Sequence, residues 1–370
     1  MSIYEKDSGN IDWIDIFKAI CITLMVMGHA GSPFTTYIYL FHMPAFILIS
    51  GYTYSGDKYT VIEYFKRKIV SLLIPMLSVN IMYILFYVLI QKNNLYPLFQ
   101  NGEAISFTSR IELLFKWLGT PDLGGATWFL FVLFSVEVLF KLISYINKKI
   151  KFKNLDLIIS LIISIFGWFI IKSQIQLPYL FDLSLFGMFY FSIGVLLRRY
   201  VNIKYYINKK LMAIVLSIMT IFFGSFYFAN QLSMNWPTRQ FASSLLIQLL
   251  SSLSPIYICY LFSKMLENSF IIKKSLIFIG KKTYTILVFH FVAFKIIFGL
   301  LIMTNIYPMD YLKDLVPRYS NTLQWLFITI ASILICLFVS WLSEKNVVFN
   351  YIFNAKIKYN TKRGDLNVKN

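Results

Sequence analysis

The sequence predicts an all-α, polytopic integral membrane protein with about ten transmembrane helices. Of its 370 residues, 58% are hydrophobic and only 14% are charged, and the mean hydropathy is +0.66. Soluble domains carry a larger charged fraction because their surfaces face water. Apolar runs close to the roughly 20 residues that a helix needs to cross a bilayer recur along the whole chain.

Ten such runs can be placed in order. The first follows an acidic leader and contains Lys18, which is unlike a cleavable signal peptide, so we expect this helix to remain in the mature protein. The predicted spans are residues 13–30, 36–55, 69–91, 126–146, 155–172, 180–197, 211–229, 241–263, 283–304 and 322–343.

The distribution of basic residues predicts the orientation of these spans. Of the 35 lysines and arginines, 25 fall in the even-numbered loops and the termini, 7 in the odd-numbered loops and 3 within spans. This alternation is the positive-inside pattern and places both termini in the cytoplasm. It also explains the net charge of +18 without a nucleic-acid partner. We expect residues 1–343 to form a single transmembrane domain and residues 344–370 a short, basic cytoplasmic tail.

The chain has only three histidines, and all lie inside apolar segments, at His29, His42 and His290. An ionisable side chain in hydrocarbon costs several kcal/mol unless it faces a partner or water. The three histidines therefore indicate a polar site inside the helix bundle. They lack i,i+4 spacing and nearby cysteine or carboxylate partners, so the sequence predicts no metal site.

Lys18 and His29 share one face of the first predicted helix. They are eleven residues apart, almost three turns, which separates them by about 16 Å along the axis. Lys18 would then lie near the cytoplasm and His29 in the outer half, an arrangement that suits a substrate with a cytoplasmic anionic part. Two structural alternatives stay open. Lys18 could pair with Asp15 at i,i+3 while snorkelling to the headgroups, and His29 could be a helix-end residue that meets interfacial water.

Four sequence patterns extend along the chain. The first two are the basic residue, ten residues and histidine from Lys18 to His29, and the segment Phe41 to Gly51, which contains Phe-x-x-x-Ser-Gly. The third is Tyr64 to Lys68 running into Pro75. The fourth combines Thr127 to Leu130 with later segments at Phe189 to Gly194 and Leu287 to His290. Together they resemble the acyltransferase 3 family of bacterial membrane O-acyltransferases, in particular its fucose 4-O-acetylase-like branch, which includes polysaccharide acyltransferases.

The resemblance implies that an acyl group, most simply acetyl, passes from cytoplasmic acyl-CoA to a hydroxyl of a cell-surface or lipid-linked polysaccharide. The enzyme would lie in the cell membrane of a bacterium and need no metal. A sugar hydroxyl requires a positioned base, and histidine is the usual one, so we assign this role to His29. Lys18 occupies a position where the family usually has arginine. Lysine keeps the charge but loses the two-pronged hydrogen-bonding geometry.

The donor and acceptor suggest further binding residues. Acyl-CoA carries several phosphate charges, and Lys66, Arg67 and Lys68 are candidates to bind them beside Lys18, although positive-inside topology alone would also place basic residues there. The candidates for contacts with the acceptor are His42, Ser50, Trp128 and His290.

Each acceptor candidate has a structural alternative. His42 could make a structural hydrogen bond, and Ser50 with Gly51 could let helices approach closely. Trp128 could belong to the interfacial aromatic belt. Nearby in the same span, Glu137 and Lys141 are spaced i,i+4 and are expected to form a buried ion pair.

A different class of function remains open at this point. The chain could be a transporter of a polysaccharide or of its lipid-linked precursor. Transporters often contain inverted repeats and broken helices, and no repeat is evident in the sequence. The acceptor sugar, the identity of the acyl group and the oligomeric state do not follow from the sequence.

Overall fold

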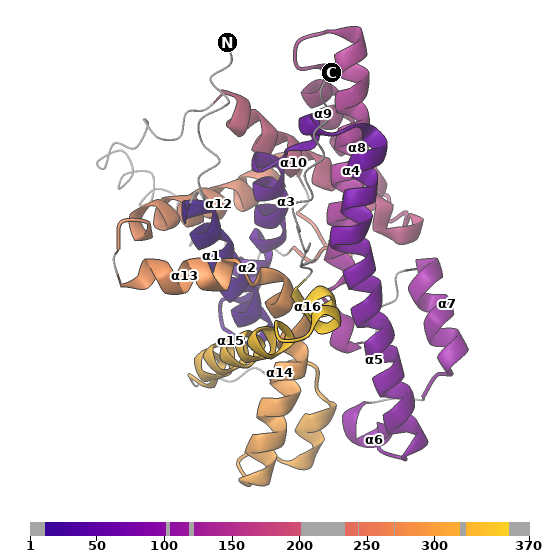
Figure 1. The fold of residues 1–370 in the computed structure, drawn as a ribbon, viewed down its shortest axis with the longest axis vertical. Helices are drawn as coiled ribbons and strands as arrows, with labels where there is room; N and C mark the ends of the chain where they lie inside the picture. The colour runs from indigo at the N-terminus through magenta and orange to yellow at the C-terminus, as the bar shows by residue number, and fades with distance from the viewer. Residues whose placement is uncertain are drawn as a thin grey trace, which may run out of the picture.

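A computed structural model describes residues 12–100, 104–117, 122–200, 234–242, 244–269, 271–318 and 323–354. These residues are almost entirely helical, and their longest helices form a bundle (Figure 1). The first half contains α1 (Asp12–His29), α2 (Thr35–Tyr39), α3 (His42–Tyr52), α4 (Val61–Lys68), α5 (Ile74–Lys92), α6 (Tyr96–Phe99), α7 (Phe107–Trp117) and α8 (Trp128–Ile150). The second half contains α9 (Leu155–Lys172), α10 (Phe181–Tyr200), α12 (Leu245–Leu266), α13 (Ile272–Gly280), α14 (Thr283–Met303), α15 (Gln324–Ser343) and α16 (Val347–Asn354).

The predicted class, a polytopic helical membrane protein, is confirmed. Within the described residues, seven helical segments are long and apolar enough to cross a bilayer: α4 with α5, then α8, α9, α10, α12, α14 and α15. The first predicted span corresponds to α1, which carries three charged residues over its 18 positions. The predicted span 211–229 lies outside the described residues. The count of ten spans therefore stays a prediction.

The second predicted span, 36–55, differs from expectation because it is broken into two short helices. Gly31 ends the first helical segment with φ of +73°, a conformation that glycine adopts without strain. The Thr35 hydroxyl then donates to the Gly28 and Ser32 carbonyls at 2.9 and 2.7 Å, which fixes the turn into α2. α3 has 11 residues and rises about 16 Å, roughly half the thickness of the hydrocarbon core. The second span therefore does not cross as one helix.

α3 packs against α10 at a backbone-to-backbone crossing. A Cβ atom added to Gly51 would lie 2.1 Å from the Phe191 carbonyl oxygen, and one added to Gly194 would lie 2.1 Å from the Leu48 carbonyl oxygen. Only glycine fits at either position, as in other close helix contacts in membranes. Two of the sequence patterns, Phe41 to Gly51 and Phe189 to Gly194, thus meet in space.

The third span contains an irregular turn that the C-terminal helix supports. Ile69–Leu73 forms a π-helical turn between α4 and α5, and such turns leave carbonyl groups without regular helical partners. The Tyr351 hydroxyl on α16 donates to the Val70 carbonyl at 2.7 Å. Asn354 also joins α16 to α15, because its side-chain oxygen accepts from the Ser340 hydroxyl at 2.5 Å. Part of the expected tail is therefore a packed helix.

Ion pairs in the described residues join side chains that the predicted topology places on the same side of the membrane. Asp182 and Arg239 form a buried two-pronged pair, with Nε to Oδ2 at 2.9 Å and Nη2 to Oδ1 at 3.2 Å. On the opposite side, Arg199 binds Asp156 and Lys148 binds Asp57. The pairing is consistent with the predicted alternation of the loops between the two sides of the membrane.

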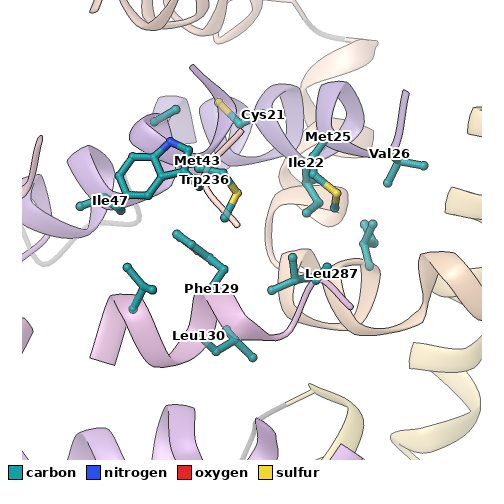
Figure 2. Close-up of a cluster of buried hydrophobic side chains, with 14 of the residues drawn as sticks. Cys21, Ile22, Met25, Val26, Met43, Ile47, Phe129, Leu130, Trp236 and Leu287 are labelled. Carbon is teal, nitrogen blue, oxygen red and sulfur yellow. The ribbon is translucent and has the colours of Figure 1, made fainter. Parts of the chain in front are cut away.

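The core lies where α1, α3, α8 and α14 converge. Figure 2 shows side chains from these helices directed toward a shared apolar space, together with Trp236. Trp236 comes from the segment 234–242 and is only 2% exposed. This apolar packing fixes the helices that carry the histidines. The labelled residues are Cys21, Ile22, Met25, Val26, Met43, Ile47, Phe129, Leu130, Trp236 and Leu287.

We predict that Gly51→Ala destabilises the fold, because the added methyl group would meet the fixed Phe191 carbonyl at 2.1 Å. Overpacking of this kind costs about 1–3 kcal/mol. The measurement is the thermal unfolding midpoint of the purified protein in detergent. Gly299→Ala is the matched control, since a Cβ atom there meets nothing within 4 Å and alanine favours a helix. Equal midpoints for the two variants would contradict the proposed crossing.

Candidate active site

The three histidines predicted to form a site lie close together in space. The ring centroids of His29 on α1 and His290 on α14 are 5.2 Å apart. His42 at the start of α3 packs against Tyr39 on α2, with ring centroids 5.3 Å apart, and Tyr39 in turn contacts His29. We call His29, Tyr39, His42 and His290 the histidine cluster. Four helices from the two ends of the chain are needed to assemble it.

His29 is held by a hydrogen bond to Tyr39. Its Nδ1 atom is 2.9 Å from the Tyr39 hydroxyl oxygen. When Nδ1–H donates to that oxygen, Nε2 keeps its lone pair and can accept a proton. The imidazole is half-buried, whereas His42 and His290 are buried. Of the three histidines, His29 is therefore the best placed to meet a substrate.

For the other two histidines, backbone carbonyl groups determine which ring nitrogen carries the hydrogen in the neutral form. The His290 Nδ1 atom donates to the Ile286 and Leu287 carbonyls at 3.1 and 2.9 Å, and the His42 Nδ1 atom donates to the Ile38 carbonyl at 2.9 Å. In a neutral imidazole the other nitrogen is then an acceptor. The His290 Nε2 atom is buried and has no hydrogen-bond partner. The cluster thus contains an acceptor atom that nothing in the described residues satisfies.

Tyr39 is the member of the cluster that the sequence does not reveal. The chain has 25 tyrosines, so one more tyrosine in an apolar segment carries no signal. Its position depends on the break between α2 and α3, which turns residue 39 toward α1. If residues 36–55 formed one continuous helix, a spacing of ten residues from His29 would not predict contact between the two side chains.

A wall of the cluster comes from the turn before α8. The Asn80 amide donates to the Thr127 hydroxyl at 2.8 Å, and that hydroxyl donates to the Gly124 carbonyl at 2.7 Å. A Cβ atom on Gly125 would lie 3.5 Å from the Phe291 ring, and the Phe291 ring centroid is 5.2 Å from that of His29. Trp128, half-buried, begins α8 directly after this turn.

The predicted donor-binding residues do not gather in one place. Lys18 pairs with Asp15 at 2.7 Å, the i,i+3 contact that was one alternative for it. Lys68 pairs with the buried Glu137. Arg67 is exposed and stacks on the Tyr59 ring at 4.3 Å. Successive residues of a helix point about 100° apart, which explains why the three basic residues diverge.

Lys66 faces a different surface again. Its exposed side chain lines a groove of about 490 Å³ between α4 and α8. None of the three histidines lines this groove, so it is separate from the histidine cluster. The other lining residues are Val61, Ile62, Tyr64, Phe65, Ile69, Val138, Lys141 and Leu142.

Glu137 organises a polar network toward the predicted cytoplasmic end. Its carboxylate accepts from the Ser50 hydroxyl at 2.6 Å and from the Tyr64 hydroxyl at 2.8 Å, besides pairing with Lys68. Ser50 lies eight positions, about 12 Å, along α3 from His42. The structure therefore places Ser50 in this network.

The expected ion pair between Glu137 and Lys141 is wrong. Lys141 donates instead to the Gly56 and Tyr59 carbonyls at 2.7 and 2.6 Å. The physical reason is that the loop 56–59 presents the Gly56 and Tyr59 carbonyl groups to α8, while Lys68 reaches Glu137 from α4. The i,i+4 spacing permits an ion pair, but Glu137 and Lys141 each bind residues from other parts of the chain instead.

Comparison with known proteins agrees with the membrane architecture and the sequence patterns. Residues 11–341 match the family model described as an acyltransferase domain, Acyl_transf_3. The chain belongs to the acyltransferase 3 family. It is therefore an acyltransferase, as predicted, and the match spans all the helices of the histidine cluster. No curated protein and no solved structure matches the chain. Among the described residues of this acyltransferase, no group of three or more potential ligands is arranged to hold a metal ion.

We predict that Tyr39→Phe lowers the turnover number of the acyltransferase by roughly tenfold. A general base contributes about 10²–10⁴-fold, and loss of the hydroxyl that orients His29 should remove only part of that contribution. The Michaelis constant for the acyl donor should change little, since the hydrogen bond and ring contacts of Tyr39 are with His29 and His42. Steady-state kinetics on the purified enzyme test this. Tyr257→Phe, at a 40% exposed tyrosine, is the control. Unchanged turnover in Tyr39→Phe would show that the contact has no catalytic role.

Proposed function

We propose that this acyltransferase transfers an acyl group, most simply acetyl, from cytoplasmic acyl-CoA to a hydroxyl of a cell-surface or lipid-linked polysaccharide, in the cell membrane of a bacterium. The observation that carries the proposal is the half-buried His29, bound through Nδ1 to Tyr39 at 2.9 Å and packed against His290. A histidine base with an orienting partner is what transfer to a weakly acidic hydroxyl requires.

The reaction needs one proton acceptor and no metal. His29 Nε2 takes the proton of the acceptor hydroxyl as its oxygen attacks the thioester carbonyl. The carbon–sulfur bond then breaks, and the CoA thiolate leaves with the proton that His29 holds. Tyr39 orients the imidazole, and in the tautomer whose Nδ1–H donates to the Tyr39 oxygen, the Nε2 lone pair takes the proton. The unpaired Nε2 atom of His290 can accept a hydrogen bond from a hydroxyl of the bound acceptor.

The donor would reach the cluster from the predicted cytoplasmic side. Lys18, at 30% side-chain exposure, lies three turns before His29 on α1. Lys66 and Arg67 have exposed head groups at the start of the third span, whereas Lys68 is held by Glu137. We assign the CoA phosphates to Lys66 and Arg67 first, because neither forms a direct ion pair among the described residues, although Glu63 lies one turn from Arg67.

Arg67→Gln should raise the Michaelis constant for acyl-CoA by about three- to tenfold and leave turnover nearly unchanged, because hydrogen bonds to a charged group contribute about 1.5–3 kcal/mol before screening by salt. Kinetics at two ionic strengths measure this, with a smaller difference at high salt. Lys148→Gln removes an equally exposed cation, which pairs with Asp57 at 2.8 Å, and serves as the control. If both variants behave alike, Arg67 contributes only general surface charge.

The function itself is tested in the host by NMR of the surface polysaccharide. A deletion strain should lose ester signals, and wild-type protein should restore them. His29→Ala at matched expression should restore less than about one hundredth of the transfer rate, because loss of a general base costs 10²–10⁴-fold. Gly299→Ala, which meets no neighbouring atom, should complement fully.

Two outcomes would contradict parts of the proposal. If the deletion abolishes polysaccharide export while the acyl content per repeat unit of the remaining polymer is unchanged, the protein acts in transport. If His29→Ala complements as well as wild type, His29 is not the base.

A further inference from the structure

Another of the buried polar groups without a hydrogen-bond partner lies on the outer side of the bundle, at Arg110 on α7. Helix α7 lies alongside the lower half of α5 in Figure 1, near the short helix α6. Among residues 107–116 of α7, Arg110 and Leu114 are the two that are buried, at 9% and 0% exposure. An arginine therefore occupies a position where α7 packs inward and an apolar residue is usual.

The Arg110 guanidinium lies over two aromatic rings. Its central carbon is 4.9 Å from the Tyr87 ring centroid and 5.8 Å from the Tyr96 ring centroid. Stacking on aromatic faces leaves the edge of a guanidinium free for hydrogen bonds in its plane. The Arg110 Nε and Nη2 atoms are both buried, and neither has a hydrogen-bond partner.

These two nitrogen atoms form the edge that binds paired oxygen atoms. The same protein shows the arrangement at Arg239, where Nε and Nη2 contact the two carboxylate oxygens of Asp182 at 2.9 and 3.2 Å. Carboxylates and phosphates both present oxygens with this spacing. The Arg110 edge is thus shaped for an anion that the described part of the chain does not supply.

The acidic residue beside Tyr87, Asp122, already has another partner. Asp122 accepts a hydrogen bond from the Gln100 amide, which also donates to the Tyr87 hydroxyl at 2.9 Å. A second cation, Lys295, donates to the Phe99 and Leu312 carbonyls at 3.3 and 2.6 Å. At this corner of the molecule, no carboxylate among the described residues forms an ion pair with Arg110, and a buried cation without a counterion is costly.

The corner is connected to the histidine cluster through a short turn. Asp122 begins the 3-10 turn Asp122–Gly124, and the next residue, Gly125, faces the Phe291 ring beside His29. Three Cα-to-Cα steps separate Asp122 from Gly125, which spans at most about 11 Å. One oligosaccharide could contact both places.

We propose that Arg110 binds an anionic group, a carboxylate or a phosphate, carried by the acyl acceptor, so that the acceptor is an acidic glycan. This inference rests on the proposed glycan acceptor. The anion forms two hydrogen bonds to Nε and Nη2 while Tyr87 and Tyr96 hold the guanidinium plane. Because the edge is buried, side chains that cover it must move when the anion enters.

The test is equilibrium binding to the full-length protein in lipid nanodiscs, without acyl donor. The probes are a galacturonic acid trisaccharide, a galactose trisaccharide, and a galactose trisaccharide with one phosphate monoester. Wild type should bind at least one acidic probe about 10- to 100-fold more tightly than the neutral one, as expected for charge-assisted hydrogen bonds. The two acidic probes distinguish a carboxylate from a phosphate.

Arg110→Gln should abolish this preference, and Arg110→Lys should keep only part of it, because lysine lacks the two-pronged edge. Lys116→Gln is the matched control: it removes one positive charge from the same helix at an exposed residue that pairs with Glu112 at 3.5 Å, and it should bind as wild type does. Size-exclusion profiles and unfolding midpoints identify any variant that fails to fold.

Two results would overturn the inference. One is equal binding of the acidic and neutral probes by the wild-type protein, a comparison that needs no variant. That result would mean that Arg110 contacts only ordered water. The other is a folded Arg110→Gln that retains the preference. Neither depends on turnover. Acylation of these trisaccharides by wild type would still support the proposed function, so the two proposals can fail separately.

Discussion

The arrangement of the whole site depends on the crossing of α3 and α10 through Gly51 and Gly194. Their backbones touch, so the position of α3 along α10 is set by carbonyl oxygens rather than by side chains that could adjust. α3 is too short to cross the bilayer, and the break that precedes it turns α2 toward α1. Tyr39 and His42 reach His29 because of that break. A continuous second helix would carry them through a different part of the bundle.

Hydrocarbon offers no hydrogen bonds, so a membrane bundle must satisfy its polar groups internally. Most buried charges in the described residues obey this constraint: Glu137 gathers two hydroxyls and a lysine, and Lys141 caps two carbonyls. The Nε2 atom of His290 and the Nε and Nη2 atoms of Arg110 are among the exceptions. The His290 atom lies in the histidine cluster, and the two Arg110 atoms lie on the outer side of that cluster. We therefore assign both residues to binding of the acceptor.

Sequence reasoning predicted the helical membrane fold and the histidines, because apolar length and rare ionisable residues are local signals. It located α9 at residues 155–172, where the structure has Leu155–Lys172. It missed the broken second span, since the break depends on Gly31 and Thr35 in a turn rather than on hydropathy. It also mispaired Glu137 with Lys141, because spacing within one helix says nothing about Lys68 on another. Tyr39 and Arg110 could not be singled out, as their roles depend entirely on tertiary neighbours.

The family match ends at residue 341, but the folded unit extends further. α16 supplies the Tyr351 hydroxyl that satisfies a carbonyl of the π-helical turn, and Asn354 fastens α16 to α15. A chain trimmed to the boundary of the match would expose that carbonyl within the segment that follows the basic residues of α4. Truncations, fusions and affinity tags should therefore begin beyond Asn354, where they leave the third span intact.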